Sequence, residues 1–393
     1  MRATEHDGRT RPVALAACGY WERRGMPTAP GQVAVAPGAP LLLLAVLAAD
    51  AAAREAAGRP LPGNGGGVLL PRPCPAWYAP PARLLGRPVL PVPVPAECGG
   101  VPDPVALAEA VRRAAERGVE PGALLLSVAD DITGTAAPPE LLHEVCEAAT
   151  DAGLLVVSDE TWRDTSHGAH DTLIVSPGEM LHGGPHESAA VVLADLGEEP
   201  EPGGPTVGIV RCPPAADPGP SLGARVRAVL DTLRGTVPVA CADAAAEVLA
   251  EAGPARERRA AAGRTRGELA TALYERATAA GALCRPPRLG SAVYADLEPL
   301  RPRLAGRGVV DAAGLEAELV RHLGPYAEGG HRFGDDPHAL RVRLHTGLLA
   351  APGGRRGGRS PGEPRSLGEP GVEEALNSLE SVLAALTDGS PPR

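Results

Sequence analysis

The sequence predicts an α/β fold with a mostly parallel central sheet, because apolar strand-like runs and helical segments alternate along it. Short runs rich in valine and leucine occur at residues 32–35, 123–128 and 154–157, and segments with helical spacing occur at 41–57 and 139–152. Short apolar runs bounded by turn residues are typical of strands covered on both faces. Their alternation with helices is typical of a parallel sheet, whose binding sites form at the carboxyl ends of the strands.

Two further features refine this fold. Residues 88–95, PVLPVPVP, predict a strand at the edge of the sheet, because alternating prolines cannot donate hydrogen bonds in a central ladder. Residues 221–251 and 254–282 each predict a long helix, and these helices would link a large domain to a smaller one.

Composition limits the class of protein. With 393 residues and 44% hydrophobic content, the chain is long enough for two domains with buried cores. The formal net charge of −10 argues against a nucleic acid as partner. The apolar run at residues 41–49 is too short to span a membrane, and the polar N-terminus leads us to expect no signal peptide. Seven scattered cysteines without a CxxC pair predict a reduced, cytoplasmic protein.

We expect five segments along the chain. The low-complexity segment among them is rich in glycine, proline and arginine, a composition typical of a disordered linker. The segments are a shortened N-terminal segment 1–30, a large domain 31–250, a small C-terminal domain with its linking helix 251–350, the low-complexity segment 351–371, and a C-terminal helix and tail 372–393.

The rest of the chain is organised around residues 191–211, VVLADLGEEPEPGGPTVGIVR. A β-branched strand ends at Asp195, a loop rich in proline, glycine and glutamate follows, and a second strand returns. The pattern resembles the segment of fold-type I aminotransferases that carries the lysine for pyridoxal phosphate (PLP), which reads D-L-G-K before a P-G-G turn and an arginine. Glu198 stands at the lysine position and Thr206 at the arginine position.

The resemblance implies the fold-type I PLP-transferase architecture, aspartate aminotransferase-like, with a large parallel-sheet domain and a small C-terminal α/β domain. The 393 residues contain no lysine, however, so all 38 residues counted as lysine or arginine are arginines. A guanidinium stays protonated and cannot form a Schiff base. Lysine-dependent PLP catalysis is therefore excluded for this chain, whatever its fold.

Other motifs mark further positions of the inherited pocket. Gly38 and Ala39 resemble the family's helix start, where backbone N–H groups hold the cofactor phosphate. Pro40 removes one such donor. In residues 71–78, PRPCPAWY, Pro75 stands where the family has an aromatic ring that stacks on the cofactor.

Trp77 and Tyr78 follow Pro75, and two interpretations stay open for them. One of them substitutes for the missing ring after a shift of the loop, which makes both candidate substrate-binding residues, or they pack in the core or a dimer interface. We favour the second interpretation, because aromatic side chains serve both of those roles well.

Two turns carry the carboxylates of the pocket. Asp131 and Thr133 lie in a segment that resembles the family's N-P-T-G turn, with Asp131 at the position of an asparagine that donates to the cofactor. Asp159 and Trp162 lie in SDETW, which resembles S-D-E-x-Y. There the aspartate protonates the pyridine nitrogen, and here tryptophan replaces the tyrosine.

Near the end of the small domain, residues 339–347 read ALRVRLHTG and resemble the strand whose arginine clamps a substrate carboxylate. Arg343 is the better match, and Arg341 points to the same face two residues earlier. The guanidinium fork suits a carboxylate. The alternative is a strand arginine that pairs with a nearby acid of the chain.

The resemblance brings Asp131, Asp159 and Glu198 together as candidate catalytic residues. Neighbouring carboxylates repel each other, so one would acquire a raised pKa and serve as general acid or base, or the group would attract an amine or a divalent metal. Each would also repel a phosphate by about 4 kcal/mol per charge pair at about 4 Å and an effective dielectric near 20. We therefore expect weak or absent PLP binding and no other cofactor.

Two classes of function stay open. One is an aminotransferase-like pseudoenzyme that binds a ligand or a partner. The other is a PLP-independent enzyme that uses the carboxylates on a small amine or amino-acid-derived substrate in specialised metabolism. Because the family's active site forms at a dimer interface, the resemblance implies a homodimer or a heterodimer with a paralogue.

A second group of polar residues contains His167, His170, His182 and His186. The HxxH spacing of the first two suits a metal. The surrounding sequence is a glycine-rich loop, however, where polar residues are expected for other reasons. We therefore expect no metal site.

Overall fold

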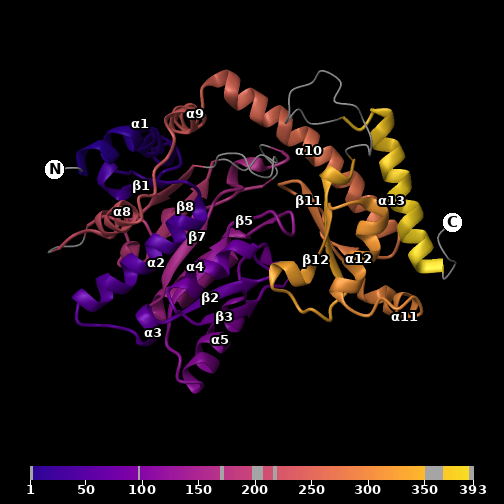
Figure 1. Cartoon of the computed structure of the whole chain (residues 1–393), viewed down its shortest axis with the longest axis horizontal. Helices are drawn as coiled ribbons and strands as arrows, with labels where there is room; N and C mark the ends of the chain where they lie inside the picture. The colour runs from indigo at the N-terminus through magenta and orange to yellow at the C-terminus, as the bar shows by residue number, and fades with distance from the viewer. Residues whose placement is uncertain are drawn as a thin grey trace.

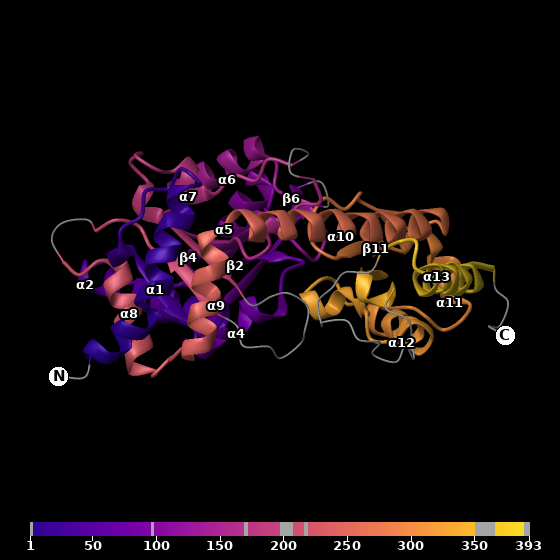
Figure 2. The same ribbon diagram turned by 90° about the horizontal axis from the view of Figure 1, so that it is seen from above.

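The computed structural model describes residues 3–95, 98–168, 172–196, 207–215, 219–349 and 366–388. A large α/β domain, formed by the first part of the chain, lies beside a smaller domain formed by the last part (Figure 1). The long helix α10 (Gly253–Ala279) runs from the large domain along the small one (Figure 2). The expected linker at 351–371 lies outside the described residues as far as residue 365.

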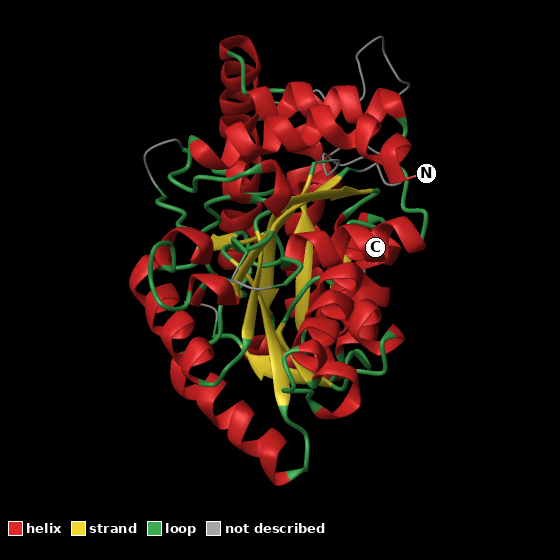
Figure 3. Cartoon of the chain, turned by 90° about the vertical axis from the view of Figure 1, so that its left-hand side faces the viewer, coloured by secondary structure: helices red, strands yellow, loops and turns green. Residues whose placement is uncertain are grey.

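A seven-stranded sheet forms the centre of the large domain (Figure 3). Its strands are β1 (Val33–Ala36), β2 (Gly67–Arg72), β3 (Val89–Pro93), β4 (Pro121–Ser127), β7 (Leu155–Asp159), β8 (Ala190–Asp195) and β9 (Gly208–Arg211). They lie in the order β1-β9-β8-β7-β4-β2-β3. The strands from β8 to β3 pair in parallel, and β9 is antiparallel to both neighbours. The prediction of a mostly parallel sheet is confirmed.

Helices cover both faces of this sheet (Figure 1). In β4, Ala123 and Leu125 face one layer of helices, whereas Leu124 and Leu126 face the other, because successive side chains of a strand point to opposite sides. This is why the strand is apolar without alternation. One layer contains α2 (Ala39–Ala56), α4 (Ala79–Leu84) and α8 (Leu222–Thr232), and the other contains α1 (Ala3–Glu22), α5 (Pro104–Glu116), α6 (Pro139–Asp151) and α9 (Val239–Ala250).

Short elements complete the large domain. They are α3 (Pro62–Gly65), α7 (Pro177–Met180), β5 (Ala129–Asp130) and β6 (Thr135–Ala136). Among the described residues, no helix combines the length and the apolar character needed to cross a membrane.

Side chains and turn residues set the ends of the helices. Asp103 accepts hydrogen bonds from the first turn of α5, and Ser221 accepts one at the start of α8. Such caps stabilise a helix by about 1 kcal/mol. The single helix expected over 221–251 is wrong, because the chain turns at Gly235 and Pro238 precedes a new helix, α9.

The edge strand was predicted correctly. β3 contains Pro91 and Pro93 and, among the described strands, pairs with β2 alone, at the outer edge of the seven-stranded sheet. The prolines therefore do not interrupt a central ladder.

The small domain packs a four-stranded antiparallel sheet against helices. The strands lie in the order β10-β11-β13-β12. Leu269 and Leu273 of α10 share a buried core with Leu376 and Leu383 of the last helix, which therefore belongs to this domain. The bounds are β10 (Leu283–Cys284), β11 (Ala292–Asp296), β12 (Ala327–Gly329), β13 (Arg341–His345), α11 (Arg301–Ala305), α12 (Ala312–Leu323) and α13 (Pro370–Asp388).

Candidate active site

A cavity of about 320 Å³ lies where the carboxyl ends of the large sheet's strands meet the small domain. We call it the acidic pocket. Parallel strands bring their carboxyl ends to one edge of the sheet, so residues far apart in the sequence meet there. The lining includes three aspartates, one arginine and three aromatic side chains, namely Asp131, Asp159, Asp195, Arg343, Trp77, Trp162 and Phe333.

Asp131 and Arg343 form an ion pair across the two domains. Arg343 Nη2 donates to Asp131 Oδ2 at 2.7 Å, and Nη1 donates to Glu328 at 3.2 Å. The pKa of Asp131 is raised, chiefly by burial, while the positive charge of Arg343 opposes the rise. The guanidinium proposed for a substrate carboxylate is thus paired with a carboxylate of the chain, whereas Arg341 pairs with Asp296 and Asp335.

Asp159 accepts three hydrogen bonds at the end of β7. Tyr78 donates its hydroxyl to Oδ2 at 2.8 Å, and the backbone N–H and hydroxyl of Thr161 donate to Oδ1 at 3.0 and 2.6 Å. Burial raises the pKa of Asp159 to about 6, although these hydrogen bonds oppose the rise. The group can therefore gain or lose a proton close to neutral pH.

The two adjacent aromatic residues separate into different roles. Tyr78 is fully buried in the core, and its contact with Trp77 is edge-to-face, with 4.6 Å between the ring centroids. Trp77 lines the acidic pocket, and so does Trp162 from the loop after β7. Tyr78 therefore packs in the core. Trp77 lines the pocket and also packs against the core, and its contact with a substrate stays a prediction.

Asp195, at the end of β8, is a pocket residue that the sequence did not identify. Its Oδ2 accepts a hydrogen bond of 2.8 Å from the backbone N–H of Ala39, 156 residues away, at the first position of α2. A helix start attracts anions, because its first N–H groups have no partners within the helix. In this chain, the carboxylate of Asp195 occupies the position at the helix start where an anionic ligand could bind.

The chain approaches this helix start closely. Gly38 has a φ of +93°, in the region that favours glycine, and lets the chain turn from β1 into α2. A side chain at Gly208 would meet the carbonyl carbon of Gly38 at 2.6 Å, so β9 also requires glycine here. Pro40 and Pro75 line the pocket beside Ala39, and Pro40 has no N–H to offer an anion.

Thr133 lies outside the acidic pocket. Its hydroxyl donates to Asp130 at 2.6 Å. Burial and the neighbouring charge of Asp131 raise the pKa of Asp130 to about 6. The turn therefore holds two adjacent carboxyl groups, of which Asp131 faces the cavity.

Two of the predicted site residues, Glu198 and Thr206, lie outside the described residues. Their distance from Asp131 and Asp159 stays untested, and their place in the pocket stays a prediction. The structure does bring Asp131 and Asp159 to the same cavity.

Two of these histidines are held by other contacts. His167 contacts the carbonyl of Gly290 at 2.9 Å through Nε2, and His182 contacts Glu187 at 2.7 Å through Nδ1. His170 falls outside the described residues. Within the described ranges, no group of three or more histidine, cysteine, aspartate or glutamate side chains could hold a metal ion.

Part of the chain is similar in sequence to a known protein family. Residues 46–193 match the family model for aminotransferases of class I and II. No curated protein sequence matches the chain.

Solved structures match nearly the whole chain. An aromatic aminotransferase from Pyrococcus horikoshii OT3 has a TM-score of 0.72 at 17% identity, over 95% of this chain and 85% of that one. An N-succinyldiaminopimelate aminotransferase from Mycobacterium tuberculosis has a TM-score of 0.68 at 22% identity, over 94% and 83%. An aspartate aminotransferase from Thermus thermophilus with maleate has a TM-score of 0.68 at 18% identity, over 94% and 81%. These likenesses confirm the fold-type I aminotransferase fold, and residues 46–193 are similar in sequence to aminotransferases of class I and II.

Proposed function

We propose that this chain is an aminotransferase-like protein that does not catalyse lysine-dependent transamination, and that its acidic pocket binds a small amine or amino-acid-like ligand. The observation that carries the proposal is the absence of lysine from all 393 residues, with Glu198 at the Schiff-base position. Without a side-chain amine, the chain cannot form the covalent link on which the family's chemistry depends.

The residues around the pocket do not fit PLP. Asp195 accepts the hydrogen bond of the N–H that starts α2, and Pro40 has no N–H. Asp131 brings an acceptor where the family brings a donor, and Trp162 has no hydroxyl. Among these residues, only Asp159 suits the cofactor, because the family has an aspartate at this position that contacts the pyridine nitrogen.

The phosphate is the part of PLP that binds least favourably in the acidic pocket, because the carboxylates repel it. A carboxylate and a phosphate about 4 Å apart repel by about 4 kcal/mol per charge pair at an effective dielectric near 20. That energy corresponds to about a thousandfold in affinity. We therefore infer that PLP binds weakly or not at all.

The same charges favour a cation. Three aspartates and one arginine of the described residues line the cavity, and three aromatic rings form its walls. An ammonium group gains from the carboxylates and from the faces of the rings. A cavity of about 320 Å³ suits a small molecule.

Two titrations test this proposal. PLP added to the protein is expected to leave the absorbance spectrum of the cofactor unchanged, and a saturable micromolar site would contradict the proposal. Primary amines and amino acids are expected to change tryptophan fluorescence, because Trp77 and Trp162 line the pocket and Trp21 is buried elsewhere. Asp159→Asn is expected to weaken that binding at least tenfold, and Glu116→Gln, an exposed control, is expected to leave it unchanged.

The alternative is a PLP-independent enzyme of specialised metabolism, and the raised pKa of Asp159 favours it. A carboxyl group with a pKa of about 6 can transfer protons at neutral pH. Turnover of an amine substrate that Glu198→Ala abolishes would support the enzyme. Binding that survives this substitution, with no turnover in either protein, would support the binding protein.

We also propose that the chain forms a homodimer, or a heterodimer with a paralogue, in the cytoplasm. The family relationship supports the dimer, and the seven free cysteines support a reducing compartment. Light scattering of the purified chain tests the dimer, and a monomeric mass at micromolar concentration would point to a paralogue as partner.

A further inference from the structure

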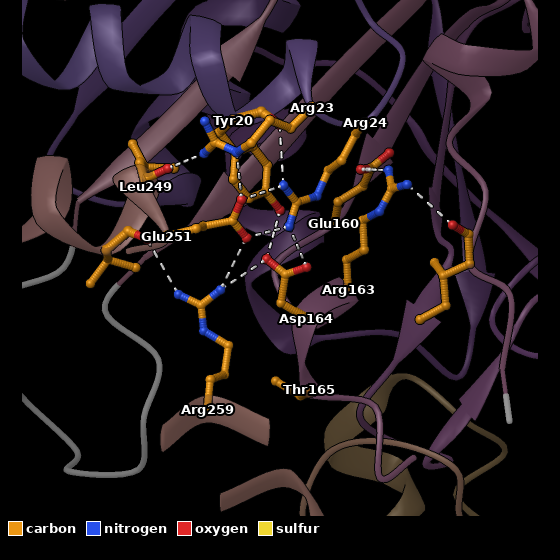
Figure 4. A network of polar contacts seen from close by, with 12 residues as sticks. Tyr20, Arg23, Arg24, Glu160, Arg163, Asp164, Thr165, Leu249, Glu251 and Arg259 are labelled. Carbon is orange, nitrogen blue, oxygen red and sulfur yellow. Dashed lines mark hydrogen bonds and ion pairs between the residues drawn. The ribbon is translucent and has the colours of Figure 1, made fainter. Parts of the chain in front are cut away.

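A second cavity, of about 730 Å³, lies between the end of α1, the loop after β7 and the first turns of α10. Its lining differs from that of the acidic pocket, and we call it the arginine cavity. Figure 4 shows the polar network on one side of it, in which several guanidinium groups converge on two carboxylates. The described lining residues include six arginines and two acids, namely Arg23, Arg24, Arg163, Arg256, Arg259 and Arg264 with Asp164 and Glu251.

Both acids are already shared between several arginines. Glu251 accepts hydrogen bonds from Arg24 at 2.7 and 3.0 Å, from Arg23 at 3.0 Å and from Arg259 at 3.5 Å. Burial disfavours the ionised form of Glu251, but Arg24 and Arg23 outweigh it and lower the pKa to about 2. Asp164 accepts from Arg24 at 2.8 Å and from Arg259 at 3.5 Å. Two negative charges therefore face three positive charges in this network (Figure 4).

Arg24 is held especially firmly. Its guanidinium carbon lies 3.6 Å from the centre of the Tyr20 ring, and the Tyr20 hydroxyl donates to Asp164 at 2.9 Å. The Tyr20 ring contacts the face of the Arg24 guanidinium, and the two carboxylates accept its hydrogen bonds. These contacts hold its charge in place before any ligand binds.

Arg163 is neutralised by its own partners. It pairs with Glu160 at 2.8 Å and with Glu179 at 2.5 Å. Even when both of these acids are counted with Glu251 and Asp164, the six arginines exceed the four acids by two positive charges. This local excess occurs in a chain whose net charge is −10.

The excess is carried by Arg256 and Arg264. Their side chains are exposed, and they have no hydrogen bond or ion pair with any residue that the structure describes. With Arg259 they lie on one face of α10 toward the cavity. Because a helix rises 1.5 Å per residue, Arg256 and Arg264 are spaced by about 12 Å along its axis.

The opposite wall suits an organic group. Leu173 and Ile174 line the cavity, and Ser166 and Thr172 add hydroxyl groups. Leu173 is 71% exposed and presents apolar surface beside the arginines. A guanidinium group can donate two parallel hydrogen bonds to two oxygens of one phosphate group.

We propose that the arginine cavity binds a small phosphorylated metabolite that carries at least two negative charges. The phosphate groups lie along the row of arginines on α10, and the organic part lies against Leu173 and Ile174. This site is independent of the acidic pocket, and a ligand there joins α10 to the loop after β7.

Calorimetric titration of the full chain with pyrophosphate tests the proposal, at fixed ionic strength because exposed charges are screened by salt. We expect micromolar binding, weakened at least tenfold in the double variant Arg256→Gln, Arg264→Gln. The double variant Arg83→Gln, Arg117→Gln removes the same charge from exposed arginines outside the cavity, and it is expected to bind as tightly as the parent.

Three results would overturn the proposal. The first is the absence of saturable pyrophosphate binding, and the second is an equal loss of pyrophosphate affinity in both double variants. The third is citrate binding as tight as that of pyrophosphate, which would assign the cavity to carboxylates. Retained thermal unfolding temperatures would show that the variants are folded.

Discussion

Glu251 connects the stability of the fold to the charge of the arginine cavity, so Glu251→Gln is an informative perturbation. The side chain is 9% exposed and contacts Arg23 and Arg24 in the turn after α1 and Arg259 on α10. Glutamine keeps the size and one acceptor oxygen but removes the charge. Arg24 and Arg259 would then keep Asp164 as their ion-pair partner, whereas Arg23 would lose its ion pair.

The size of the effect follows from the pKa. Lowering the pKa of Glu251 from 4.5 to about 2 corresponds to about 3 kcal/mol of folding free energy, because one pKa unit corresponds to about 1.4 kcal/mol. A carboxyl group whose pKa is depressed by folding contributes its full stability above its unfolded pKa. The contribution of Glu251 is therefore present above pH 4.5 and is lost as the pH falls toward about 2.

Urea unfolding at several pH values measures this contribution. At pH 7, Glu251→Gln is expected to lower the free energy of unfolding by about 3 kcal/mol, and the difference from the parent should vanish near pH 2. Glu109→Gln is the control, because Arg112 and Arg113 also lower the pKa of Glu109 to about 2, but on the solvent side of α5, where its side chain is 34% exposed. Solvent screening should make its effect much smaller.

The same variant makes the arginine cavity more positive. We expect Glu251→Gln to strengthen pyrophosphate binding about three- to tenfold at low salt, while it weakens the fold. Equal stability of parent and variant at pH 7, or an equal loss in Glu109→Gln, would refute the electrostatic reasoning.

Three further predictions concern the large domain. Asp195→Asn removes the charge at the start of α2 and should raise the affinity for PLP or inorganic phosphate at least tenfold, measured by titration. Tyr78→Phe removes a hydrogen bond that lowers the pKa of Asp159, so that pKa should rise above about 6 in the pH dependence of tryptophan fluorescence. Leu47→Ala leaves a cavity in the buried core and should cost about 2–5 kcal/mol in urea unfolding.

Much of the large domain was predictable from the sequence. The apolar runs of β4 and β7 do not alternate with polar residues because both faces of these strands are covered, and the prolines of β3 place it at an edge. The break between α8 and α9 was missed, because the helical spacing continues on both sides of a turn that only Gly235 and Pro238 mark.

The pocket was predictable only in part. Asp131 and Asp159 follow neighbouring parallel strands, so their meeting follows from the order of the sheet. Asp195 ends a strand in the same way, but its contact with Ala39 depends on where β8 lies relative to α2. Trp77 and Tyr78 are adjacent, and only packing decides which of them faces the core.

The arginine cavity had no signal in the sequence. Arg256, Arg259 and Arg264 have the spacing of an ordinary solvated helix face. The site arises because α10 passes the end of α1 and the loop after β7, segments that are distant in the sequence.

The central claim is that this aminotransferase-like pocket does not hold PLP. Equilibrium dialysis with PLP, after acetylation of the N-terminal amine, tests it most directly, because no side chain of the chain carries an amine. We expect no saturable binding. A saturable micromolar site that Asp159→Asn weakens would contradict the account.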